Sequence, residues 1–212
     1  MWYTKAMNII YIGLSLCIIW SIWGYFSSRV ENMPYSVLES KKPYEVRLYP
    51  AHIVAQTTVK GSYNDALNEG FRIVAGYIFG ANTKKESIAM TAPVIEKTSV
   101  SESIAMTAPV MTTVEGETHT ITFGMPRSYT METLPTPTDK NVQLVTIPEK
   151  KMAVIRFSWI RTDARLKAKK AELLKTLKKD NISVIGELQY AGYNAPWTPP
   201  WMTRHEVLVE IK

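Results

Sequence analysis

Three histidines and ten methionines carry the nitrogen and sulfur atoms in this sequence that could bind a metal ion. His119 lies in phase with the apolar Ile121, and His205 begins a similar alternating run, so both are expected on the apolar face of a strand. His52 lies out of phase with Ile53 and is expected on the opposite face, at the surface. The favoured interpretation is a surface histidine for His52 and a hydrogen-bonded histidine at a core edge for His119 and His205. The alternative is a ligand, or a pocket wall, for a flat apolar molecule.

Several methionines cluster around a repeated segment. The segment ESIAMTAPV occurs at Glu86–Val94 and again at Glu102–Val110. Proline cannot donate a hydrogen bond to a neighbouring strand, so Pro93 and Pro109 are expected at strand ends. The two copies therefore predict one long hairpin. The favoured role of the methionines is packing in a sheet, and haem ligation is the alternative. These methionines are Met90, Met106, Met111 and Met125.

The motifs of several common enzyme classes are missing from the sequence. No GxGxxG or GxxxxGK[ST] segment is present to hold a phosphate, and no GxSxG segment is present to expose a nucleophile. The carboxylates are scattered and form no spaced pair suited to acid–base chemistry. Cys17 is the single cysteine, which rules out an internal disulfide and leaves few ligands for a structural metal. We therefore predict a binding protein without a metal site rather than an enzyme.

The N-terminal residues are expected to form a membrane anchor. Residues 6–28 carry no charge and would span roughly 34 Å as a helix, enough for a bilayer core. Trp20 and Trp23 crowd one end, as interfacial aromatic residues do. A cleaved signal peptide is the alternative, but no small-residue cleavage site follows. We predict an uncleaved anchor at 1–28, a polar linker at 29–42 and a domain at 43–212, exported to the periplasmic or extracytoplasmic side.

The domain shows one order of elements twice. The first pass has alternating strands from Tyr44 and Ile53, a helix from the Ser62 cap to Phe79, and a strand at 119–125. The second has strands at 143–147 and 153–157, a helix at 163–179, and strands at 188–193 and 206–211. This repetition predicts an α+β fold with two pseudo-symmetric half-units whose sheets meet, and with helices packed outside.

The second helix is strongly basic. Lys and Arg far outnumber Asp163 and Glu172 between residues 161 and 179, and the chain carries a formal net charge of +6. A solvated face over a narrow leucine stripe is the favoured interpretation. Contact with anionic lipid is the alternative. Nucleic acid is not expected as a partner, because no nucleic-acid-binding motif accompanies the charge.

The domain resembles the SOUL haem-binding protein family over residues 43–212. The resemblance implies a distorted β-barrel of two pseudo-symmetric halves with two flanking helices, and binding of haem or another tetrapyrrole. The domain also resembles gyrase-inhibitor-like drug-sensing domains, which implies a cleft for small apolar or cationic molecules. The matching stretches are YEVRLYP (Tyr44–Pro50), GYIFGANTKKESIAMTAPV (Gly76–Val94), FGMPRSYTMETLPTP (Phe123–Pro137), AVIRFS (Ala153–Ser158) and AGYNAPWTPPWMTRHEVLVEI (Ala191–Ile211).

The resemblance also implies where a ligand would lie. Some relatives carry a proposed iron-binding histidine where this chain has Leu48, so that ligand is absent, and His52 is not an obvious substitute. His205 stands where the family usually has an asparagine. Other relatives hold a tetrapyrrole in an apolar cleft beside the first domain helix, with basic side chains near the propionates. By position, this implies a site formed by Arg72, Ile73, Tyr77 and Lys84.

The leading hypothesis is a membrane-tethered, non-enzymatic protein that binds haem or a related tetrapyrrole without a strong dedicated iron ligand. The alternatives are a sensor of the gyrase-inhibitor-like type and an interaction module at the membrane surface. The candidate site residues are Arg72, Ile73, Tyr77, Lys84, His52, His119 and His205.

Overall fold

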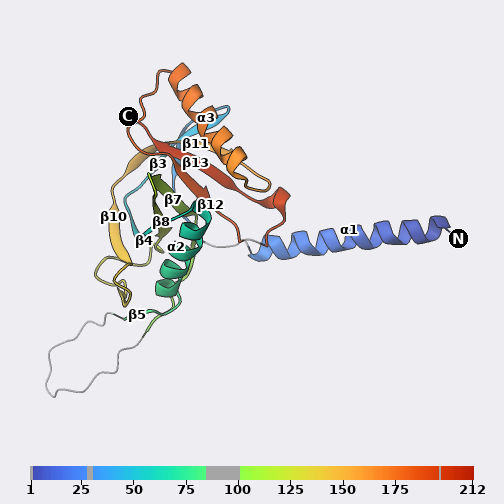
Figure 1. The fold of residues 1–212 in the computed structure, drawn as a ribbon, viewed down its shortest axis with the longest axis horizontal. Coiled ribbons are helices and arrows are strands. Elements are labelled where there is room, and N and C mark those ends of the chain that lie inside the picture. The colour runs from blue at the N-terminus through green and yellow to red at the C-terminus, as the bar shows by residue number, and fades with distance from the viewer. Residues whose placement is uncertain (1, 28–30, 85–100, 196) are drawn as a thin grey trace, which may run out of the picture.

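A single curled β-sheet organises the domain (Figure 1). The computed structural model describes residues 2–27, 31–84, 101–195 and 197–212. Within these residues nine strands form the sheet, and all neighbouring strands run antiparallel. In spatial order the strands are β10 (Gln143–Ile147), β4 (His52–Lys60), β8 (Thr118–Gly124), β7 (Val110–Glu115), β12 (Gln189–Gly192), β13 (His205–Glu210), β11 (Lys150–Phe157), β3 (Tyr44–Tyr49) and β2 (Ser36–Lys41).

The strand order interleaves the two predicted half-units. Strand β3 pairs with β11 and strand β10 pairs with β4, so the first strand of each half-unit lies beside the second strand of the other. Strands β7 and β12 join the halves at the centre. As far as the chain is described, the sheet keeps two open edges at β10 and β2. The α+β class is confirmed, the predicted distorted barrel is a curled half-barrel sheet, and the pseudo-symmetry stays a prediction.

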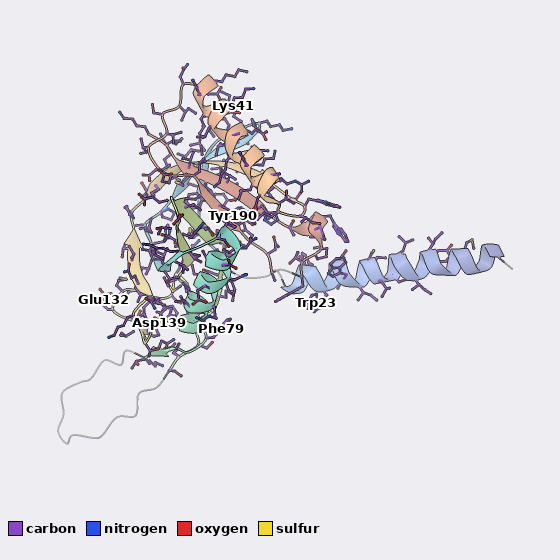
Figure 2. All side chains as sticks on the ribbon, in the orientation of Figure 1. Trp23, Lys41, Phe79, Glu132, Asp139 and Tyr190 are labelled. Atoms are coloured by element: carbon purple, nitrogen blue, oxygen red, sulfur yellow. The ribbon has the colours of Figure 1, made fainter. Side chains whose placement is uncertain are left out.

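The predicted linker at 29–42 contains an edge strand. Strand β2 pairs with β3 with a register shift between Val37 and Glu39. All of its side chains are exposed, so no alternation of buried and exposed residues marked it in the sequence. At its end, Lys41 lies 2.9 Å from the carboxylate of Asp180, near the far end of the domain (Figure 2). Two further pairs lie outside the sheet: β1 (Glu31–Asn32) with β6 (Thr107–Ala108), and β5 (Asn82–Thr83) with β9 (Thr136–Pro137).

Both domain helices begin where the sequence predicted. Helix α2 (Tyr63–Ile78) is capped by Ser62, whose hydroxyl accepts a hydrogen bond from the Asp65 amide. Gly80 follows its end with a φ of +119°, a conformation that favours glycine. Helix α3 (Asp163–Lys179) is capped by Thr162, whose hydroxyl accepts a hydrogen bond from an amide of the first turn. Capping therefore fixes both starting points.

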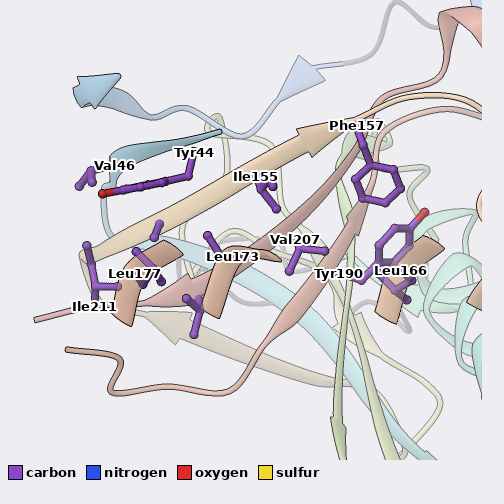
Figure 3. Close-up of a cluster of buried hydrophobic side chains, with 12 residues drawn as sticks. Tyr44, Val46, Ile155, Phe157, Leu166, Leu173, Leu177, Tyr190, Val207 and Ile211 are labelled. Atoms are coloured by element: carbon purple, nitrogen blue, oxygen red, sulfur yellow. The ribbon is translucent and has the colours of Figure 1, made fainter. Parts of the chain in front are cut away.

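Each domain helix covers one part of the same face of the sheet. The stripe of Leu166, Leu173 and Leu177 on α3 packs against β3, β11 and β13 (Figure 3). Helix α2 packs over β4 and β8, where its side chains meet Ile121 and Phe123. These two clusters form the core on the helix side, and they leave the opposite face of the sheet for other segments.

The repeated segment is only partly described. The first copy lies outside the described residues, and the hairpin between the copies stays a prediction. In the second copy, Ile104 is buried and its amide donates to the carbonyl of Ile78. The copy then leads into β7, whose two neighbours are β8 and β12. Met125 is buried in the α2 core, which agrees with the packing role predicted for it.

Helix α1 (Trp2–Ser27) extends away from the domain and contacts it only near its C-terminal end (Figure 1). In the described part of the chain, no helix combines the length and apolar character needed to cross a membrane. The predicted anchor at 1–28 and the division into anchor, linker and domain stay predictions.

Candidate functional site

The face of the sheet opposite α2 and α3, called here the concave face, carries the candidate site. Successive side chains of a strand point to opposite faces. On β4, Ile53 and Ala55 contribute to the α2 core, whereas His52, Val54 and Gln56 line a cavity on the concave face. Residues from every strand of the sheet except β2 line this cavity. The sheet therefore curls around it.

Two cavities adjoin here. The smaller, of about 240 Å³, lies on the concave face, and the larger, of about 370 Å³, lies beside it near the start of β4 and the end of β8, where Ile53 and Met125 of the α2 core also line it. Met33 and His52 line both cavities, so these two residues lie at the boundary between the cavities. Pockets for drug-sized ligands measure roughly 300–1,000 Å³, which places the larger cavity at the low end of that range. Other residues around the larger cavity include Pro50, Thr107, Met125, Arg127 and Tyr129. Those around the smaller one include Tyr49, Met111, Lys150, Met152 and Leu208.

His52 is held in one orientation and one tautomer. Its Nδ1 lies 2.8 Å from the carbonyl oxygen of Pro50. A carbonyl oxygen can only accept a hydrogen bond, so Nδ1 carries the proton in the neutral ring and Nε2 keeps its lone pair. Histidines that bind metals are commonly oriented in this way, by donating the other ring N–H to a backbone carbonyl. His52 is therefore prepared to accept a hydrogen bond or to bind a metal through Nε2.

The walls of the smaller cavity combine thioethers, aliphatic groups and neutral polar groups. Met33, Met111 and Met152 supply flexible, polarisable side chains that adapt to a ligand's shape. Lys150 is the basic residue of this wall, and its ammonium group lies 2.5 Å from Glu210. A lysine ammonium has three donor hydrogens, so this ion pair leaves it capacity for a second acceptor. The wall suits an apolar molecule that carries a negative group at one edge.

The segment between α1 and β2, residues 31–35, packs against the concave face and is called here the N-terminal segment. The Met33 amide donates a 2.8 Å hydrogen bond to the carbonyl of Ala108. The ring of Tyr35 lies 5.4 Å from that of Tyr49, and the guanidinium of Arg47 lies 4.2 Å from the Tyr35 ring centroid. Met33 is buried, so this segment is packed and not merely laid across the surface. It closes one side of both cavities.

A buried ionic cluster lies under that segment. Glu206 is fully buried, and its two oxygens are shared between Arg47 at 2.9 Å and Arg204 at 2.8 Å. The Tyr193 hydroxyl donates a 2.7 Å hydrogen bond to the same carboxylate. Burial, together with the charge of Glu206, raises the pKa of Tyr193 above its usual value. These contacts satisfy the carboxylate within the protein, so its role is to hold β3, β13 and the N-terminal segment together.

A model of the SOUL heme-binding protein family matches residues 30–210 of this sequence. The chain belongs to the SOUL heme-binding protein family. The match covers the whole sheet and begins within the segment predicted as a linker, in agreement with the strands found there. The family's description names haem binding and no reaction. No curated protein matches the chain significantly.

Several solved structures share the fold of this SOUL protein. The EcmrR C-terminal domain superposes with a TM-score of 0.58 at 8% identity, over 85% of this chain and 99% of that chain. An uncharacterized conserved protein from Listeria innocua gives 0.54 at 13% identity, over 81% and 93%. A hydrolase from Listeria innocua gives 0.51 at 12% identity, over 82% and 94%. At such low identity these likenesses establish the fold alone.

Four candidate residues from the SOUL resemblance line neither cavity. Arg72 is exposed and pairs with Glu69, and Ile73 packs at the edge of the α2 core. The Tyr77 hydroxyl donates to the carbonyl of Pro135 at 2.9 Å, and burial raises the pKa of Tyr77 to about 12. Lys84 lies 3.7 Å from Glu102. The helix face that was expected to border a cleft packs instead against the core, because α2 lies flat on β4 and β8.

The other two histidines are engaged inside the SOUL fold. His119 is buried, and its Nε2 lies 3.1 Å from the carbonyl oxygen of Gly61. His205 uses both ring nitrogens: Nε2 donates to the Trp159 carbonyl at 3.0 Å, and Nδ1 accepts from the Tyr190 hydroxyl at 2.7 Å. Both agree with the favoured interpretation of hydrogen-bonded histidines. The structure thus brings His52 alone of the seven candidates to the cavities.

Sequence reasoning missed most of the cavity wall. Met33 lies in the segment treated as a linker, and Lys150 and Gln189 come from strands far apart in the sequence. A usable signal existed on β4, where the out-of-phase positions run from His52 to Gln56. That alternation identified the opposite face of the sheet but did not show that the face is hollow.

Proposed function

We propose that this SOUL protein binds haem or a related tetrapyrrole non-covalently on the concave face, with His52 as the residue that would hold the iron. The observation that carries the proposal is the 2.8 Å contact between His52 Nδ1 and the Pro50 carbonyl, which leaves the Nε2 lone pair at the wall shared by both cavities. This assigns a specific ligand where the sequence had indicated none.

The residues present fit such a group in kind. Met111, Met152 and Leu208 would bury the apolar ring, and Lys150 would pair with a propionate. Neither cavity alone is large, so binding requires Met33 to move aside and join them. A methionine side chain has three rotatable bonds and can make that change without a shift of the backbone.

A sensor for small cationic molecules is the second candidate, and the cavity walls disfavour it. A buried cation requires an opposite charge nearby. The described residues lining the two cavities include His52, Lys150 and Arg127 but no carboxylate. A ligand with negative groups is therefore favoured over a cation.

We also propose that α1 tethers the protein to a membrane, with the SOUL domain exported. Apolar side chains with large exposed fractions cover the described part of α1, among them Ile12, Leu16 and Ile19. A helix that is apolar all round normally lies in protein or lipid.

Titration of the full-length protein in detergent with haemin tests the ligand proposal. The expected result is a saturable shift of the Soret band at micromolar haemin, with a stoichiometry of one. Binding of apolar cations in preference to haemin would favour the sensor instead. The absence of any saturable shift would refute haem binding.

A further inference from the structure

The tryptophans of this chain have an unusual distribution. Of six in the sequence, three belong to α1, and the other three are Trp159, Trp197 and Trp201 in the domain. All three domain tryptophans are exposed, by 48%, 52% and 45%. Tryptophan is ordinarily a largely buried residue, so three exposed ones on one domain require an explanation.

The domain tryptophans lie where α1 meets the domain. The Trp20 indole Nε1 donates a 2.9 Å hydrogen bond to the carbonyl of Trp197, and its ring packs edge-on against Trp201 with centroids 5.5 Å apart. The rings of Trp23 and Trp197 lie 6.0 Å apart. Gly24 permits this approach, because a Cβ there would lie 2.5 Å from Pro199 Cδ. Figure 2 shows Trp23 at the domain end of α1.

Trp159 belongs to the same surface and is held in a strained conformation. Its φ is +83°, a value that bulky residues rarely adopt. Its amide donates to the carbonyl of Pro200 at 3.0 Å, and its own carbonyl accepts hydrogen bonds from Thr203 and His205. Neighbouring Ile160 is also exposed. Backbone strain fixed by several hydrogen bonds is typical of a functional surface, and here it displays an exposed aromatic ring.

Basic groups adjoin these aromatic residues. Helix α3 starts at Asp163, three residues after Ile160, and carries Lys167 and further lysines along its exposed side. Arg165 donates to the carbonyl of Ile160 at 3.0 Å and so fixes the loop to the helix. Tryptophan rings with an apolar body and a polar N–H favour the membrane–water interface, and lysines favour anionic headgroups.

We propose that Trp159, Ile160, Trp197 and Trp201 form an interfacial collar that docks the domain on an anionic lipid bilayer around the point where α1 leaves it. The collar rests on the proposed tether for its orientation and is independent of haem binding. The occupant is lipid because the collar is continuous with the apolar surface of α1 and is flanked by the basic α3. In Figure 1, the domain end of α1 lies on the same side of the domain as the red segment that leads into β13, and α1 contacts the short helix Pro200–Met202.

Fluorescence of the full-length protein in phosphatidylcholine–phosphatidylserine vesicles tests the collar. The vesicles contain lipids brominated near the headgroup, which quench nearby tryptophans. Wild type is compared with Trp159→Phe and Trp201→Phe, and Trp23→Phe serves as the matched variant within α1. We expect each collar variant to lose a blue-shifted, bromine-quenched component of the emission, as Trp23→Phe does.

The possible outcomes distinguish failure of the collar from failure of the membrane tether and from failure of haem binding. Loss of a quenched component from Trp23→Phe alone would leave the tether standing and overturn the collar. Failure of the protein to float with vesicles, with no quenching at any position, would overturn both. Shielding of Trp159 that depends on protein concentration and not on lipid would overturn lipid docking in favour of self-association. Haemin titration of the same samples reports on the ligand site separately.

Discussion

Arg47 Nη1 lies 2.9 Å from Glu206 Oε2, and both side chains are buried. This pair joins β3 to β13, two strands that are separated in the sheet by β11. Removing one partner of a buried ion pair leaves an uncompensated charge, whereas a half-exposed pair contributes little. Strand β13 contains one residue of each kind, because Glu206 makes the buried pair and Glu210 makes a partly exposed pair with Lys150.

Glu206→Gln should therefore lower the free energy of unfolding by about 3–5 kcal/mol, because Arg47 and Arg204 lose their shared carboxylate. Glu210→Gln, four residues further along β13, should cost at most about 1 kcal/mol. Urea unfolding of both variants and wild type gives the comparison. Equal losses would mean that burial of the Glu206 cluster does not set its contribution.

Two glycines of α2 make a second matched pair. A Cβ at Gly70 would lie 2.5 Å from Ile121 Cδ1 and 3.0 Å from its Cβ, so Gly70→Ala forces α2 away from β8. Such overpacking costs about 1–3 kcal/mol. At Gly76 the nearest atom would be 4.0 Å away, so Gly76→Ala should gain up to about 1 kcal/mol from helix propensity. Thermal unfolding in which Gly70→Ala is the more stable variant would contradict this account of helix–sheet packing.

The partly buried His205 should make the stability of the fold decrease as the pH falls. Burial lowers its pKa, the hydrogen bond to the Trp159 carbonyl opposes the shift, and the charges of Arg161 and Arg165 add to it. A lowered pKa in the fold means that the unfolded chain binds the proton more readily. The stabilising contribution is then complete above the ordinary pKa of 6.5 and is lost as the pH falls below it.

His205→Asn removes the titrating group and keeps a donor for the Trp159 carbonyl. Urea midpoints of wild type and variant, measured between about pH 7.5 and pH 5, should diverge with pH. The wild type should lose more stability on acidification than the variant. Parallel losses in the two proteins would show that His205 does not contribute to acid sensitivity.

The Met33 side chain should determine whether the two cavities join into one site large enough for haem. Met33→Ala removes the side chain that stands between them and should tighten haemin binding, even though truncating a buried methionine costs about 2–5 kcal/mol of stability. Met111→Ala enlarges the smaller cavity without joining the two, and should leave the affinity closer to that of wild type. Haemin titrations of both variants decide the point, and weaker binding by Met33→Ala would argue against a joined cavity.

Local sequence signals fixed most of the elements but not the site. The Ser62 cap and the alternation on β4 depend on neighbouring residues, so the start of α2 and the two faces of β4 could be predicted. Strand β2 was missed because its side chains are all exposed. The pairing of β3 with β11 joins segments that lie far apart in the chain, and no local pattern encodes it.

The site depended on those distant pairings. Tyr77 looked available on a helix face, yet its hydroxyl is satisfied by the Pro135 carbonyl within the core. His52 looked like a surface residue, and it does face away from the α2 core. Only the curl of the sheet and the course of the Met33 segment turn that outer face into a cavity wall.

The central claim is that His52 Nε2 is the iron-binding atom, and the haemin spectrum of His52→Ala with added imidazole tests it most directly. His205→Asn is the matched control, because its imidazole is already engaged by Trp159 and Tyr190. We predict that His52→Ala loses the wild-type Soret position and binds haemin more weakly, that free imidazole restores the position, and that His205→Asn keeps it. An unchanged Soret band and affinity in His52→Ala would contradict the claim.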